Sequence, residues 1–197
     1  VKADSGASLL EVEDLAVEFD TYGGIVQAVR GVSFSVEKGK TLAIVGESGC
    51  GKSVTVQSMM GLIPMPPGRI TSGSAKLKGQ EILGRTVVNG KEIRGSEIGM
   101  IFQDPMTSLN PTMTIGDQIA EPLQVHRGYS YKKAFNEAIR LLEMSKIPEA
   151  AKRARQYPFE FSGGMLQRAM IAMAIACKPS ILIGDEPTSA LDVTIQA

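Results

Sequence analysis

The chain opens with alternating apolar and polar positions that predict β-strands. Residues Leu9–Phe19 mix apolar and acidic side chains at short period, and residues Ile25–Val36 alternate well enough to predict a second strand. The Gly23-Gly24 pair between them is typical of a turn. We therefore expect two strands joined by a tight connection.

Further along, predicted strands alternate with predicted helices. Short apolar runs predict strands at Thr41–Val45, Ser74–Lys78, Ile98–Phe102 and Ile181–Ile183, and longer patterns predict helices at Lys52–Leu62 and Met165–Cys177. Between residues 114 and 145 the apolar positions recur at helical spacing, as at Ile115, Ile119 and Leu123. Strands that alternate with helices favour an α/β fold with a parallel sheet, and we expect the helical block to be an inserted subdomain.

Composition narrows the classes of protein that the chain can belong to. Lys plus Arg equals Asp plus Glu at 21 each, so charge gives no reason to expect a nucleic acid partner. The longest apolar run, Ala169–Cys177, is far shorter than the ~20 residues that a membrane-spanning helix needs. The two cysteines, Cys50 and Cys177, and the single histidine, His126, exclude a disulfide framework and a His-rich metal site. We expect a globular domain from a reducing compartment.

A glycine-rich segment carries the strongest chemical signal. Residues 46–53 match the pattern G-x-x-x-x-G-K-[ST] and lie between an apolar run and a predicted helix. The glycines let successive backbone N–H groups turn toward phosphate oxygens, and the start of the helix adds positive potential. We expect Lys52 to reach the β- and γ-phosphates and the Ser53 hydroxyl to bind Mg²⁺.

A second acidic segment completes this chemistry. Asp185 and Glu186 follow the apolar run Ile181–Ile183, at the end of a predicted strand where α/β sheets bind ligands. Hydrolysis of a phosphoanhydride with a metal ion needs a carboxylate beside Mg²⁺ and a carboxylate that takes a proton from water. The pair fits both roles.

Further segments resemble the motifs of ABC-type ATPases. Phe161–Arg168 is similar to the signature motif of that family, Ser189–Asp192 resembles its D-loop, and Gln103 resembles its Q-loop glutamine. The order and spacing of the motifs agree from Leu9 to Ala197. The resemblance implies a P-loop NTPase fold with a parallel core sheet, an N-terminal antiparallel β subdomain and an inserted helical subdomain.

The resemblance also implies the site residues. Catalytic roles fall to Lys52, Gln103 and Glu186, and binding of Mg²⁺ to Ser53, Gln103 and Asp185. Contacts with ATP are expected from Gly46, Glu47, Ser48, Gly49, Cys50, Gly51, Lys52, Ser53 and Val54, and from Ser162, Gly163 and Gly164, which act on the γ-phosphate of nucleotide held by an opposing ATPase. An aromatic residue stacks on adenine in the family, and Tyr22 is the first choice here, with Phe19 as the alternative.

Details of the sequence narrow the resemblance to the peptide/nickel importer subfamily. Gln103–Pro111, Met165 and the tail Ala190–Ala197 are most similar to the ATPase subunits of oligopeptide or dipeptide permeases. Tyr157–Glu160 also occurs in nickel-importer ATPases, which stay an alternative, as does a soluble ABC ATPase outside transport. The implied partners are a second ATPase subunit, two transmembrane permease subunits that meet residues 106–114, and an extracytoplasmic substrate-binding protein. The implied place is the cytoplasmic face of the inner membrane.

Members of the family continue past the position of Ala197 with a helix, a strand and a switch histidine. We therefore expect a partial nucleotide-binding domain that lacks the C-terminal part of its core and is inactive alone. The expected divisions are residues 8–112 for the β subdomain and phosphate-loop core, 113–177 for the helical subdomain, and 178–197 for the carboxylate strand and D-loop. Because His126 lies in the helical block, we expect it to be a surface residue.

Overall fold

A computed structural model describes residues 8–85, 87–88 and 91–186 of the chain. The chain forms two compact units, residues 1–91 and residues 92–197. The segment that resembles a D-loop, Ser189–Asp192, and the tail Ala190–Ala197 lie outside the described residues.

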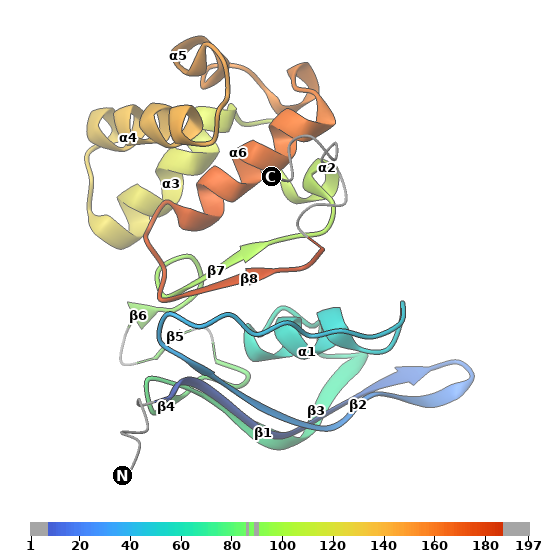
Figure 1. The fold of residues 1–197 in the computed structure, drawn as a ribbon. Helices are drawn as coiled ribbons and strands as arrows, with labels where there is room; N and C mark the ends of the chain where they lie inside the picture. The colour runs from blue at the N-terminus through green and yellow to red at the C-terminus, as the bar shows by residue number, and fades with distance from the viewer. Residues whose placement is uncertain (1–7, 86, 89–90, 187–197) are drawn as a thin grey trace. The chain divides into compact units, whose positions relative to one another are not determined.

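The first unit is built on an antiparallel sheet, as the alternation predicts. Strands β1 (Ser8–Thr21), β2 (Gly24–Glu37), β3 (Gly68–Leu77) and β4 (Gln80–Glu81) lie in the order β2-β1-β3-β4 (Figure 1). A tight turn at Tyr22-Gly23 joins β1 to β2, and β1 pairs antiparallel with both β2 and β3. The sequence did not predict the short strands β4, β5 (Val87–Val88) and β6 (Lys91–Glu92), of which the last two form a separate pair.

One face of β1 supplies the apolar contacts of this sheet. Leu10, Val12, Leu15 and Val17 are all buried, with the regular alternation broken between Val12 and Leu15. The register with both neighbouring strands shifts at the same place. Gly73 of β3 has a φ of +105°, and a Cβ there would lie 2.5 Å from the Cα of Leu15. Glycine is required because the two backbones approach too closely for any side chain.

The predicted strand at Thr41–Val45 is wrong. These residues adopt no strand or helix, and Leu42, Ile44 and Val45 are 44%, 41% and 90% exposed. A parallel strand in a sheet core needs hydrogen-bonded neighbours and covered faces, and the described part of the chain gives this segment no strand partner. Apolar β-branched composition alone therefore did not produce a strand here.

Helix α1 (Lys52–Met59) follows the phosphate loop and is shorter than the predicted Lys52–Leu62. The N–H of Gly61 bonds to the carbonyl of Ser58, and Gly61 has a φ of +63°, so the chain turns out of the helix there. Glycine reaches this left-handed conformation without steric cost, which explains the early end of the helix.

The second unit combines a parallel pair of strands with packed helices (Figure 1). Strands β7 (Ile98–Ile101) and β8 (Ile181–Gly184) are parallel, with Ile101 paired to Gly184, and this confirms a parallel sheet in the fold. The helices are α2 (Pro105–Ser108), α3 (Ile115–Arg127), α4 (Tyr131–Met144), α5 (Ala150–Arg153) and α6 (Gly163–Ile175), with a 3₁₀ turn, η1, at Pro158–Glu160.

The predicted helical block proves to be a pair of helices, α3 and α4, that pack with α6. Ile119, Leu142 and Leu166 are among the fully buried side chains of their shared core. Gly128, with a φ of +64°, ends α3 and allows the turn into α4. Among the described residues, no helix is both long and apolar enough to cross a bilayer.

Candidate active site

The glycine-rich segment forms an exposed loop that leads into α1. Gly49 and Gly51 have φ values of +80° and +93°, and Gly51 is the N-cap residue of the helix. A Cβ on Gly51 would lie 2.3 Å from the carbonyl oxygen of Ala28 in β2, so no larger residue fits there. Left-handed glycines of this kind turn backbone N–H groups toward one side of a loop. Left-handed glycines before a helix are consistent with the phosphate-binding loop that the sequence predicts.

Lys52 lies across this loop and holds its two ends together. Its Nζ donates hydrogen bonds to the carbonyl oxygens of Gly46 and Glu47, both at 2.8 Å. The N–H of Cys50 bonds to the carbonyl of Glu47 at 3.3 Å, which closes a turn within the loop. A Cβ on Gly46 would lie 2.6 Å from the Sγ of Cys50. The loop thus combines a cation with a glycine cradle, and these residues fit the phosphates of a nucleotide.

The parallel strands of the second unit bring Gln103 and Glu186 together. Each residue lies two positions beyond the end of its strand, β7 or β8, and the carboxyl ends of parallel strands meet at the same sheet edge. The Nε2 of Gln103 donates a hydrogen bond to Oε2 of Glu186 at 2.9 Å, and both side chains are exposed. The N–H of Asp185 bonds to the carbonyl of Ile101, which fixes the acidic pair at the strand end. The sequence placed each residue at a strand end but did not predict this contact.

The segment that resembles the signature motif begins α6. Ser162 is the N-cap residue, and its Oγ accepts a hydrogen bond from the N–H of Met165 at 3.4 Å. Ser162 and Gly163 are exposed, and a Cβ on Gly163 would meet no atom within 4 Å. The Ser162 hydroxyl thus caps the N–H of Met165, no atom crowds the position of a Cβ on Gly163, and a helix start of this kind attracts anions.

Gln118 is a site-organising residue that sequence reasoning missed. Its side chain on α3 is only 6% exposed. It accepts a hydrogen bond from the N–H of Asn110 and donates to the carbonyls of Asn110 and Met113, at 2.8, 2.9 and 3.1 Å. The segment after Gln103, which the resemblance assigns to the permease contact, is therefore held by a buried amide. A polar residue within the apolar stripe of a predicted helix was the available signal.

The other predicted residues lie as follows. Tyr22 is fully exposed in the turn between β1 and β2, whereas Phe19 is half-buried on β1. Val54 is half-buried in the first turn of α1, and its carbonyl accepts a hydrogen bond from Ser58. His126 is half-buried near the end of α3 rather than fully at the surface. The choice of Tyr22 over Phe19 as the adenine contact stays a prediction.

The expected Mg²⁺ ligands come from both units. Ser53 lies in the first turn of α1 in the first unit, and Gln103 and Asp185 follow strands in the second. Within the described ranges, no group of three or more His, Cys, Asp and Glu residues is placed to hold a metal ion. A hydroxyl, an amide and a carboxylate are oxygen donors of the kind that Mg²⁺ prefers, and it usually keeps several waters as well.

Comparison with known proteins extends this picture. The model of the ABC transporter family matches residues 29–189. The chain is 59% identical, over 96% of its length, to the oligopeptide transport ATP-binding protein OppD of Bacillus subtilis, and 56% identical, over 96%, to the dipeptide transport ATP-binding protein DppD of the same species. It covers 53% and 56% of those proteins, so the chain spans about half the length of the curated relatives it matches.

A solved structure agrees with the fold. The ATP-binding cassette MJ0796, described as a dimer in a post-hydrolysis state bound to ADP and Pi, matches with a TM-score of 0.80 and 27% identity. The match covers 94% of this chain and 77% of that one.

Proposed function

Because the chain belongs to the ABC transporter family, we propose that it is the nucleotide-binding part of an ATPase subunit that powers peptide import. The observation that carries this proposal is the phosphate loop, in which left-handed glycines lead into α1 and the ammonium of Lys52 lies across the loop. A loop of this shape would offer a cation and backbone N–H groups to triphosphate oxygens, which supports the proposal.

In the proposed reaction Lys52 binds the β- and γ-phosphates of ATP, and Glu186 takes a proton from the attacking water. Gln103 positions the Glu186 carboxylate through the hydrogen bond of 2.9 Å to Oε2. Ser53, Gln103 and Asp185 would hold Mg²⁺, which supplies charge neutralisation at the phosphate oxygens when it is bound. Because each contribution acts on the same transferring phosphoryl group, loss of one costs much of the rate.

The start of α6 serves a second nucleotide in this proposal. Ser162, Gly163 and Gly164 would meet the γ-phosphate of ATP held by a second ATPase subunit, so that a complete site needs both subunits. The exposed, Ser-capped helix start supports this assignment, because it presents backbone N–H groups and positive potential. The dimeric cassette with a TM-score of 0.80 supports the same arrangement.

The transported substrate is proposed from the relatives, which are named as oligopeptide and dipeptide transport proteins. We propose that the subunit lies at the cytoplasmic face of the membrane against two permease subunits, with a substrate-binding protein on the other side. Residues 106–114 would contact the permeases, and Met106, which is 65% exposed, offers an apolar side chain there. Uptake of labelled peptides by the assembled transporter tests the substrate class, and nickel uptake without peptide uptake would contradict it.

Substitution of Lys52 tests the ATPase proposal directly. We expect Lys52→Ala to weaken binding of a fluorescent ATP analogue by about 100-fold, which is ~2.7 kcal/mol, because the loop then lacks its ammonium. Lys38→Ala is the control, because Lys38 is an exposed lysine of the same unit that lies outside the loop. Equal affinities of the Lys52→Ala and Lys38→Ala proteins would refute the phosphate-loop assignment.

A further inference from the structure

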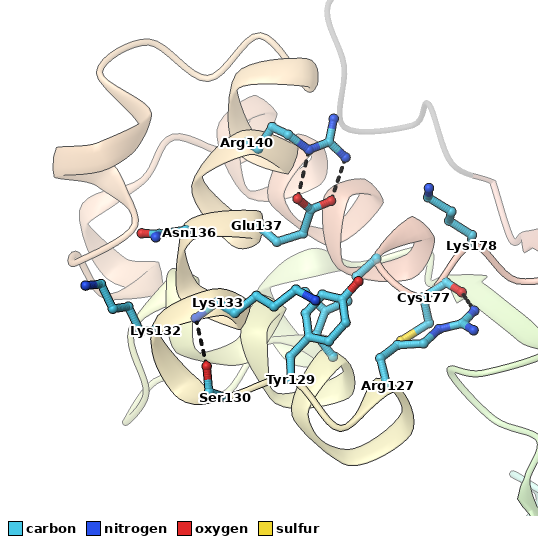
Figure 2. A pocket seen from close by; sticks show the side chains of 12 residues that line it. Arg127, Tyr129, Ser130, Lys132, Lys133, Asn136, Glu137, Arg140, Cys177 and Lys178 are labelled. Carbon is cyan, nitrogen blue, oxygen red and sulfur yellow. Dashed lines mark hydrogen bonds and ion pairs between the residues drawn. The ribbon is translucent and has the colours of Figure 1, made fainter.

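A cavity in the helical part of the second unit has a charge that the proposed ATPase function does not use. Its volume is about 1080 Å³, and it lies between the end of α3, the first half of α4 and the end of α6 (Figure 2). Cations that line it are Arg127, Lys132, Lys133, Arg140 and Lys178. Of the described residues around it, only Glu137 contributes a carboxylate, although the whole chain carries 21 acidic and 21 basic side chains.

Some of this charge is compensated within the protein. Arg140 forms hydrogen bonds of 2.6 and 2.9 Å with the carboxylate of Glu137, and Arg127 donates to the backbone carbonyl of Cys177 (Figure 2). The hydrogen bond from Arg140 is the main reason that the pKa of Glu137 is lowered, and the charges of Lys178 and Lys133 lower it further. The basic side chains thus act together as a positive field within the cavity.

The helix dipoles account for the position of only some of the cations that line the cavity. Arg127 and Lys178 lie near the C-terminal end of α6, where cations are favourable because of the helix dipole. Lys132 and Lys133 lie instead in the first turn of α4, where the same dipole disfavours cations, and that turn holds no acidic residue. Lys133 gains some compensation because its Nζ lies 3.7 Å from the centre of the Tyr129 ring (Figure 2).

We propose that this cavity binds a small molecule that carries a phosphate or pyrophosphate group. Lysines at the start of α4 add to the positive potential of that helix start, and Lys178 adds a further positive charge to the lining of the same cavity. The Ser130 hydroxyl, which also lines the cavity, adds a neutral hydrogen-bonding group. The volume of about 1080 Å³ is large enough for a small molecule, and the predicted phosphate loop of the first unit is a separate place for phosphate.

Titration with inorganic pyrophosphate tests the proposal, in a Lys52→Ala background so that the phosphate loop does not dominate the signal. We expect isothermal titration to show binding, and the added pair Lys132→Gln and Lys133→Gln to weaken it by at least about tenfold, or ~1.4 kcal/mol. The matched control is the pair Lys146→Gln and Lys152→Gln, which removes the same charge from outside the cavity and should leave the dissociation constant unchanged. Thermal melts of all the proteins serve to check that each variant is folded.

Two further variants test the effect of charge, because one keeps a positive charge and the other removes a negative charge. Lys133→Arg keeps the charge and should change affinity by less than about threefold, whereas Glu137→Gln removes the carboxylate that competes for Arg140 and should tighten binding. Affinity should also fall as salt rises, because the cavity is open to solvent. Absence of pyrophosphate binding in the Lys52→Ala protein, equal loss in both lysine pairs, or binding of an acidic peptide in place of pyrophosphate would overturn the proposal.

Discussion

Gly51 and Gly163 belong to the glycine-rich motifs, yet the structure gives them opposite tolerances. Gly51 combines a φ of +93° with a Cβ position 2.3 Å from a backbone oxygen. Gly163 starts α6 with ordinary helical geometry, and a Cβ there points into open space. The first glycine is therefore required for folding, and the second has no structural reason to be glycine.

Alanine substitutions separate these roles. We expect Gly51→Ala to lower the free energy of unfolding by at least about 2 kcal/mol, because it adds backbone strain and a clash. Gly163→Ala should leave it unchanged or raise it by up to about 1 kcal/mol, because alanine is the better helix former. Urea denaturation measures both, and an equal loss of stability would contradict the geometry at these positions.

The same Gly163→Ala protein tests the signature. If α6 begins against nucleotide of a second subunit, the added methyl group lies where that nucleotide must approach. In the full-length subunit we expect steady-state ATP hydrolysis to fall by at least about tenfold, or ~1.4 kcal/mol, while ATP binding to the protein's own phosphate loop is retained. Hydrolysis at the unsubstituted rate would exclude the start of α6 from the site.

For single residues, the sequence predicted the structure where the backbone conformation requires a particular residue type, such as glycine. The spacing of Gly46, Gly51 and Lys52 predicted a phosphate-binding loop before a helix. The structure has a left-handed Gly51 there and Lys52 lies across the loop, and phosphate binding stays a prediction. The contact of Gln103 with Glu186 escaped prediction, because it depends on the register of β7 against β8, which neither residue specifies alone.

Among the elements, the segment between α2 and α3 is anchored to α3 by one buried side chain, that of Gln118. Gln118 satisfies backbone groups of Asn110 and Met113, so that this irregular stretch keeps one conformation without belonging to a helix or strand. Capping of α3 by Thr114, whose Oγ accepts from the N–H of Asp117, fixes the other end. The proposed permease contact is thus built on α3.

We expect Gln118→Ala to lower the free energy of unfolding by about 2–4 kcal/mol, because it leaves backbone groups without their partner. Glu121→Ala, at an exposed position of the same helix, should stay within about 0.5 kcal/mol of the original. Hydrogen exchange should also become faster in residues 110–113. Equal stability of the two variants would show that water replaces the amide without cost.

Elements with a strong period were predictable, and those that depend on distant partners were not. The alternation over Leu9–Phe19 gave β1 to within a few residues, and the helical spacing gave the start of α3, whereas the division of the helical block at Arg127 was not predicted. The strand predicted at Thr41–Val45 has the composition of a strand, but a strand needs neighbours, which composition does not contain. The short α5 and η1 follow from local turns that have no period.

For the whole molecule, the residues of the proposed reaction are divided between its units. The phosphate loop lies in residues 1–91, while Gln103, Glu186 and the start of α6 lie in residues 92–197. The family and the order of its motifs were readable from the sequence over nearly the whole chain, and the comparisons confirm the family. The basic cavity could not be predicted from the sequence, because the cations that line it are spread along the chain from Arg127 to Lys178.

Glu186→Gln tests assembly as well as catalysis. The amide oxygen can still accept the hydrogen bond from Gln103, but it cannot take a proton from water, so hydrolysis should nearly stop while ATP affinity is kept. In the full-length subunit we expect ATP to convert the variant to a dimer in light scattering, and Glu121→Gln, an exposed control on α3, to turn over normally. Hydrolysis that continues in Glu186→Gln, or a dimer that forms equally without ATP, would contradict the shared-site proposal.

The hydrogen bonds of Lys52 to the carbonyls of Gly46 and Glu47 affect the affinity of the loop for nucleotide. The ammonium already has acceptors at 2.8 Å, so each phosphate oxygen that it takes is exchanged against a carbonyl of its own loop. Phosphate binding would then break the hydrogen bonds of Lys52 within the loop. The measured affinity would be the difference between the hydrogen bonds gained with phosphate and those lost within the loop. A ligand without acceptor oxygens cannot replace those carbonyls, so the exchange favours ligands that carry anionic oxygens, such as phosphates.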